Sequence, residues 1–159
     1  MKKELLELAL DQINFEFESA YLYLNMAAWA DDAGYAGAKH WMEKQASEEM
    51  EHGMKIMHFL QELDETVVLK PIGLDKLEVA DYIDLFKQSL AHEKIVTERI
   101  GKLFSASMAS QNYAMVRLMG WFVDEQAEEE ATLNDIITRL EKVPTPIGIM
   151  RMDDSLAQR

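Results

Sequence analysis

Cysteine is absent from the 159 residues of the chain. This absence excludes disulfide bonds, zinc held by thiolates and iron-sulfur clusters, and it fits a reducing, cytoplasmic environment. Any bound metal must therefore be held by Glu, Asp, His or Gln side chains. No apolar run reaches the roughly 18 residues that a membrane helix needs, so we expect neither export nor membrane insertion.

Basic residues are scarce as well. The chain has 16 Lys and Arg residues against 29 Asp and Glu residues, which gives a formal net charge of -13. This balance disfavours nucleic acid and anionic lipid as partners, and it favours cations. Acidity could also serve only to keep the protein in solution, so the positions of the acids must decide between these interpretations.

Helix-breaking residues are few, with seven glycines and three prolines in the whole sequence. Pro71, Pro144 and Pro146 fall in two places only, which predicts an all-α chain with long uninterrupted helices. The segment 65–75 is too long for a tight turn, so we expect it to cross the length of a helix bundle. The predicted helices span residues 2–32 and 36–63, 79 to a break at 110–112, from there to 141, and, as a short fifth helix, 147–156.

The length and an apolar content of 48% are enough for one core. We therefore expect a single domain over residues 1–159, in which a four-helix bundle covers about 2–141. No composition shift or low-complexity stretch marks a second domain.

Polar residues interrupt the predicted core-facing stripe of each bundle helix. On the second helix, Met42, Gln45, Glu49, His52 and Ile56 follow a spacing of three and four, so Glu49 and His52 are predicted to point inward. The corresponding stripes on the other helices are Ile13, Glu16, Ala20 and Tyr23; Leu90, Glu93, Thr97 and Ile100; and Met119, Val123, Gln126 and Glu129. Each helix therefore carries polar side chains in the middle of its apolar face.

These inward carboxylates require a partner, because a buried isolated carboxylate costs several kcal/mol. The predicted stripes contain no Lys or Arg, which leaves His52 as their only candidate cation. A bound metal balances several carboxylates better than a salt-bridge network does. The positions also repeat, since adding 77 to Glu16 and Glu49 gives Glu93 and Gln126. The pattern indicates two similar helix pairs around a metal cluster.

The segments 14–23, 48–52, 92–93 and 121–130 together resemble the four helix motifs of the non-haem ferritins, in particular the bacterial and archaeal type. The resemblance covers essentially the whole chain. It implies a ferritin-like four-helix bundle with a long crossover between its second and third helices. It also implies a cytoplasmic ferroxidase that oxidises Fe(II) with oxygen or hydrogen peroxide and stores ferric mineral in a homo-oligomeric cage of twenty-four subunits.

The resemblance also implies roles for individual residues. Glu16, Glu49 and His52 correspond to the ligands of a first iron, Glu49 and Glu93 to those of a second, and Gln126 lies beside it. Tyr23 matches a tyrosine near this di-iron centre, where it could donate electrons or only hydrogen-bond to a ligand. The residues that match an adjacent third iron site are Glu48, Glu125, Glu128 and Glu129.

The fourth helix departs from bacterioferritin and rubrerythrin, because Gln126 and Glu129 replace their second Glu-x-x-His pair. This difference disfavours a symmetric, permanently occupied di-iron cofactor and favours release of the oxidised iron. Two alternatives remain open at this stage. One is a di-iron oxidase that acts on an organic substrate, and the other is a helical cage or bundle whose metal centre is inactive.

Overall fold

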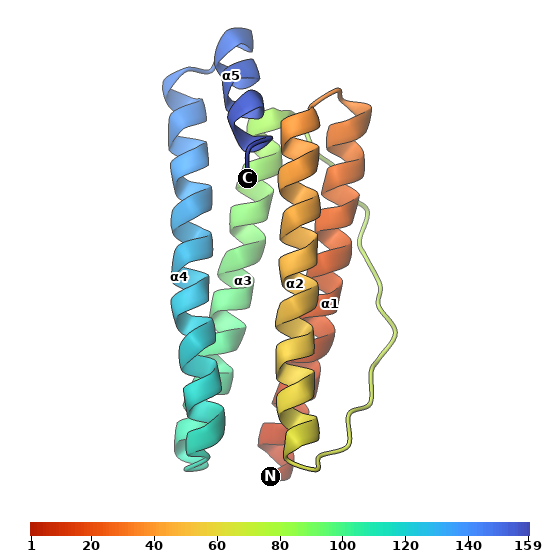
Figure 1. Ribbon diagram of the computed structural model, residues 1–159, viewed down its shortest axis with the longest axis vertical. Coiled ribbons are helices and arrows are strands. Elements are labelled where there is room, and N and C mark those ends of the chain that lie inside the picture. The colour runs from red at the N-terminus through yellow and green to blue at the C-terminus, as the bar shows by residue number, and fades with distance from the viewer.

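The computed structural model describes residues 1–159, which form five helices and no strands. Four helices lie side by side as a bundle, and the short fifth lies at one end, beside the start of the second (Figure 1). This arrangement confirms the predicted all-α bundle. The helices are α1 (Lys3–Asp32), α2 (Ala36–Glu62), α3 (Tyr82–Ala109), α4 (Tyr113–Lys142) and α5 (Pro146–Leu156).

A long extended segment joins α2 to α3 and runs along the bundle beside α1, from one end to the other (Figure 1). The backbone N–H of Lys70 donates to Oδ1 of Asn14 over 2.8 Å, and the Lys70 ammonium pairs with Asp11. These contacts fix the crossover to α1. Because the crossover returns the chain to the end of the bundle where α2 begins, α2 and α3 run in the same direction. None of the five helices combines the length and apolar character that a membrane crossing needs.

The start of α3 differs from the sequence prediction by three residues. We expected this helix to begin near Val79, but it begins at Tyr82. The carboxylate of Asp81 accepts a hydrogen bond from the backbone N–H of Asp84 over 2.8 Å, so Asp81 is the N-cap residue. Asn112 caps α4 in the same way by accepting from the N–H of Met115. A side-chain acceptor thus fixes where each of these helices starts.

On α3 and on α4, one residue of the predicted core-facing stripe was misplaced by one position. Thr97 and Val123, which we expected to face inward, are exposed, and Val96 and Phe122 are buried in their places. Both spacings keep the alternation of three and four, so the sequence pattern alone allowed either choice. The inward positions of Glu93, Gln126 and Glu129 are the same in both.

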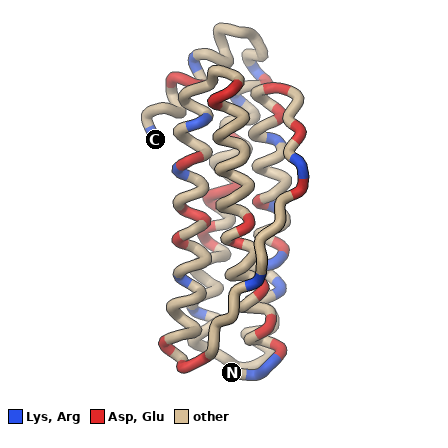
Figure 2. Tube along the Cα trace, turned by 90° about the vertical axis from the view of Figure 1, so that its right-hand side faces the viewer, with Lys and Arg blue, Asp and Glu red and all other residues tan.

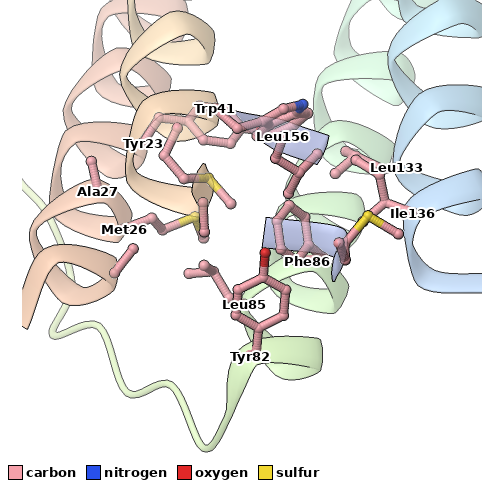
Figure 3. Close-up of a cluster of buried hydrophobic side chains, with 14 of the residues drawn as sticks. Tyr23, Met26, Ala27, Trp41, Tyr82, Leu85, Phe86, Leu133, Ile136 and Leu156 are labelled. Atoms are coloured by element: carbon pink, nitrogen blue, oxygen red, sulfur yellow. The ribbon is translucent and has the colours of Figure 1, made fainter. Parts of the chain in front are cut away.

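The apolar core consists of two separate clusters. One cluster, near α5, includes Tyr23, Trp41, Phe86, Leu133 and Leu156, so all five helices contribute to it (Figure 3). The other lies toward the opposite end and includes residues of α1 to α4. On every bundle helix, buried polar residues lie between the parts that belong to the two clusters. A polar layer therefore crosses the middle of the bundle.

Candidate metal centre

The polar layer consists of side chains that the alternating pattern of each helix turns inward. Its carboxylates are deeply buried, since Glu16 and Glu93 are 0% exposed and Glu49 is 1% exposed. No Lys or Arg belongs to the buried residues. The other buried polar residues of the layer are Gln12, Ser19, Gln45, His52, Ser89, Gln126 and Glu129.

Three of these residues form a compact group. Ligand atoms of Glu16, Glu49 and His52 all lie within 4.8 Å of one another. Glu16 comes from α1, whereas Glu49 and His52 lie on adjacent turns of α2, with 3.5 Å between Nδ1 of His52 and Oε2 of Glu49. The structure thus brings together three of the residues that the sequence predicted as metal ligands.

Four polar atoms of this group have no hydrogen-bond partner. They are Oε2 of Glu16, both carboxylate oxygens of Glu49, and Nδ1 of His52. Leaving buried polar atoms unpaired is unfavourable, and a cation bound among them would satisfy all four. Two carboxylates and one imidazole are also ligands that divalent iron accepts. These residues therefore fit a metal ion.

Glu93 lies in the same layer but has other partners. The hydroxyl of Tyr23 donates to Oε1 of Glu93, and Nε2 of Gln126 donates to Oε2 over 3.0 Å. Both hydrogen bonds are buried, and they link α1, α3 and α4. Glu93 is consequently held beside the compact group, and it does not belong to it.

The four residues expected at a third site have different environments. The side chain of Glu48 is 41% exposed and pairs with Arg159, and Glu125 Oε1 lies 4.0 Å from Nε2 of His52. Glu128 is exposed, whereas Glu129 is buried and accepts a hydrogen bond from Gln45. The structure does not bring these four carboxylates together as a compact group.

Burial changes the protonation of the layer. It raises the pKa of Glu16 and of Glu49 well above the ordinary value, and the neighbouring charge of Glu49 raises the pKa of Glu16 further. Burial likewise raises the pKa of Glu93. In the absence of metal, these carboxyl groups retain protons that water-exposed carboxylates would lose. A cation that binds here must therefore displace protons, so its affinity should rise with pH.

Because the pKa of Glu129 is raised, the metal-free protein should become less stable as the pH rises. Burial, together with the charge of Glu93, raises the pKa of Glu129 from 4.5 to about 7. Between these values the folded chain keeps a proton that the unfolded chain loses, so the free energy of unfolding falls with rising pH. A shift of this size corresponds to about 3 kcal/mol of stability lost across this pH range.

We therefore expect Glu129→Gln, which is neutral at every pH, to melt like the wild type at about pH 4 and at a higher temperature at about pH 8. Thermal unfolding with a chelator present measures both. The amide that this substitution introduces keeps an acceptor for the side chain of Gln45, so the comparison isolates the charge. Equal melting temperatures at both pH values would contradict the raised pKa.

Two glutamines of the layer were not predicted as site residues. Nε2 of Gln12 donates to Oε1 of Glu16, and Nε2 of Gln45 donates to Oε2 of Glu129, each over 2.8 Å. Both glutamines lie four residues before an inward glutamate of their own helix, Glu16 or Glu49. This repeated spacing of an amide one turn before a carboxylate was the signal that could have identified them.

Several known proteins are similar to this chain in sequence over most of its length. Residues 6–143 match the protein family described as Ferritin-like domain. A bacterial non-heme ferritin from Staphylococcus haemolyticus is 37% identical over 143 residues, which cover 90% of this chain and 86% of the relative. One from Staphylococcus aureus is 33% identical, with the same two coverages.

Solved structures of archaeal ferritins are similar to this chain in fold as well. The open pore ferritin of the archaeon Archaeoglobus fulgidus superimposes with a TM-score of 0.97 and is 33% identical in sequence. The superposition covers 100% of this chain and 98% of that chain. A humanized archaeal ferritin gives the same TM-score and identity. The similarity thus includes the crossover and α5 as well as the bundle.

Proposed function

Since the chain belongs to the ferritin-like domain family, we propose that it oxidises Fe(II) within the helix bundle and stores the iron as ferric mineral inside a cage of its own copies. The observation that carries this proposal is the buried group of Glu16, Glu49 and His52, whose four unpartnered polar atoms suit a cation. Similarity to bacterial non-heme ferritins over 90% of the chain supports iron as that cation. Iron is the substrate and the cargo of this site.

The residues of the layer have separate roles in this proposal. Glu16, Glu49 and His52 hold the first Fe(II), while Glu49 and Glu93 hold the second, beside Gln126. Carboxylate oxygens are hard ligands that stabilise Fe(III) over Fe(II), and the imidazole adds a ligand without adding negative charge. Each Fe(II) loses one electron, which oxygen or hydrogen peroxide accepts. The carboxyl groups lose their protons as iron binds.

Tyr23 and Gln126 position Glu93 for the second iron. Each of them donates one hydrogen bond to a different oxygen of this carboxylate. Since a carboxylate oxygen has two lone pairs, each oxygen can keep its hydrogen bond and still bind iron. Burial and the charge of Glu93 raise the pKa of Tyr23 well above its ordinary value, so the tyrosine stays a hydrogen-bond donor. An electron-donating role for Tyr23 remains a prediction.

We place the third iron at Glu48, Glu125, Glu128 and Glu129. Glu48 and Glu125 each come one residue before an inward residue, and one residue along an α-helix corresponds to a rotation of about 100°. Both side chains are therefore turned away from the centre, to the side on which Glu125 approaches Nε2 of His52. Glu129 connects this site to the layer, because it is buried and its charge acts on Glu49. A more exposed set of carboxylates suits the transfer of oxidised iron from the centre to the cavity.

Replacing Glu48, Glu125 and Glu128 together with Ala should change the amount of oxygen consumed per iron and slow later turnovers. The first fast phase should change less, because Glu16, Glu49 and His52 stay in place. Oxygen-electrode measurements at increasing iron loads test this expectation. The matched control replaces Glu78, Glu98 and Glu141, which make exposed pairs with lysines away from the proposed site. An unchanged oxygen-to-iron ratio in the first variant would remove the third site from the oxidation mechanism.

Apolar side chains on the outside of the subunit support a cage. Tyr21 and Leu24 of α1 are each 50% exposed, and Val68 and Leu69 of the crossover are 66% and 52% exposed. Neighbouring subunits would cover such a surface. The solved structures that superimpose on this chain are of archaeal ferritins. We therefore propose a homo-oligomeric cage of twenty-four subunits in the cytoplasm, and light scattering would give its mass.

Aerobic addition of Fe(II) to the purified metal-free protein tests the proposed function. We expect rapid growth of ferric absorbance with no organic substrate present, followed by uptake of far more iron than the subunits have sites. An oxidase that requires an organic substrate would not sustain turnover under these conditions. An inactive cage would show only the slow oxidation that also occurs without protein.

A further inference from the structure

The side chain of Arg159 lies against the exposed part of the proposed third site. Nη2 of Arg159 is 2.5 Å from Oε2 of Glu48, and Nη1 donates to Oε1 of Gln45 over 2.9 Å. The guanidinium carbon also lies 4.6 Å from the centre of the Trp41 ring. Only 28% of this side chain is exposed. Arg159 is thus the cation that forms an ion pair with Glu48 in this structure.

Arg159, three residues after the end of α5, reaches Glu48 because α5 is fixed to the start of α2. The carboxylate of Asp153 accepts hydrogen bonds from the backbone N–H groups of Gly37 and Ala38, over 2.9 and 2.7 Å. From there Trp41, Gln45 and Glu48 follow on α2 at spacings of three and four, which places them on one stripe of the helix. All three residues of this stripe contact Arg159.

Gln45 connects this arginine to the interior of the site. Its side-chain oxygen accepts from Arg159, while its Nε2 donates to Oε2 of Glu129. The arginine therefore contacts one proposed third-site ligand directly and a second through one buried amide. Its positive charge also lowers the pKa of Glu129, against the larger effect of burial.

We propose that Arg159 is a tethered cation that competes with iron for Glu48 and thereby weakens the third site. This inference rests on the proposed function, which assigns Glu48 and Glu129 to that site. Iron that binds there must displace the guanidinium from Glu48 and bind against its charge. The arginine thus favours passage of iron through the third site over retention, and the ion pair that forms again after iron leaves keeps Glu48 oriented between turnovers.

Zinc titration of the metal-free cage tests this role without redox chemistry. Isothermal calorimetry should show that Arg159→Gln tightens the weaker class of Zn²⁺ sites by about two- to fivefold, the range expected for a partly exposed ion pair. Arg159→Lys keeps the charge but lacks the planar fork of the guanidinium, so the Zn²⁺ affinity of this variant should lie between those of the wild type and Arg159→Gln. The matched control is Arg151→Gln, which removes one charge from the exposed surface of α5. Its affinity should equal that of the wild type.

A second pair of variants excludes a merely structural effect of the substitution. In a Glu48→Gln background, Arg159→Gln should change the Zn²⁺ affinity much less, because the direct competing contact is already gone. Weaker or unchanged Zn²⁺ binding in the single variant Arg159→Gln would overturn the competition. So would an equal gain in the presence and absence of Glu48.

Zinc anomalous scattering from crystals of the same proteins separates this inference from the proposed function. Zinc among Glu48, Glu125, Glu128 and Glu129 with equal affinity in wild type and Arg159→Gln would keep the third site and refute the role of Arg159. No zinc at these residues in either protein would refute the proposed third site, and the competition with it.

Discussion

Glu49→Ala and His52→Ala are each expected to slow the fast phase of Fe(II) oxidation by about 100-fold or more. Glu49 is the residue that the two proposed iron positions share, and His52 is the only imidazole of the compact group. Losing either leaves an iron without enough ligands to favour Fe(III). Stopped-flow absorbance after mixing the metal-free cage with Fe(II) in air measures the rate.

Two controls separate chemistry from folding. Glu49→Gln keeps the volume of the side chain and should still be slow, because a neutral amide oxygen is a weaker ligand than a carboxylate. His58→Ala removes an exposed histidine from the same helix and should oxidise iron at the wild-type rate. A normal fast phase in His52→Ala cages would place the oxidation centre elsewhere.

Gly37→Ala is expected to destabilise the protein by about 1–3 kcal/mol, the usual cost of an overpacked contact. A Cβ atom on Gly37 would lie 1.8 Å from the backbone oxygen of Asp153, so α5 would have to move away from α2. The N–H groups of Gly37 and Ala38 would then lose their acceptor. Denaturant unfolding gives the stability, and hydrogen exchange reports on these two amides.

Gly101→Ala is the matched control for this substitution. Gly101 lies within α3, and a Cβ atom there would have nothing within 4 Å. Helix propensity alone favours Ala by about 1 kcal/mol, so this variant should be as stable as the wild type or more so. If Gly37→Ala were stabilised to the same extent, the close contact between α5 and α2 would be wrong.

The sequence predicted the helices well because the spacing of apolar residues and the rarity of helix breakers are local signals. The start of α3 was misplaced because Val79 continues the apolar spacing, whereas the hydrogen bond from the N–H of Asp84 to Asp81 decides the boundary. Thr97 and Val123 were misplaced because a neighbouring apolar residue offered an equivalent spacing. Contacts between helices decide such cases, and a single helix does not reveal them.

The candidate site was predictable to the level of which residues face inward. Glu16, Glu49, His52 and Glu93 interrupt apolar stripes, and all four are buried in one layer. Their partners were not predictable, because Tyr23 and Glu93 are 70 residues apart in sequence and meet only in the bundle. Arg159 was not predictable at all, since its position depends on how α5 packs against α2.

Acidic residues also occur along the whole bundle, far from the polar layer, and basic residues lie among them (Figure 2). Their surface pairs are mostly exposed, such as Lys102 with Glu98 and Lys87 with Glu141. Exposed pairs of this kind contribute little to stability. The net charge therefore says little about the site, and burial distinguishes the carboxylates that matter.

Iron anomalous scattering from crystals soaked with Fe(II) in air would locate the iron sites within each subunit. We expect one peak among Glu16, Glu49 and His52 and a second between Glu49 and Glu93, both inside the bundle of a single subunit. Iron found only at exposed carboxylates, with the buried group empty and its hydrogen bonds unchanged, would contradict the account.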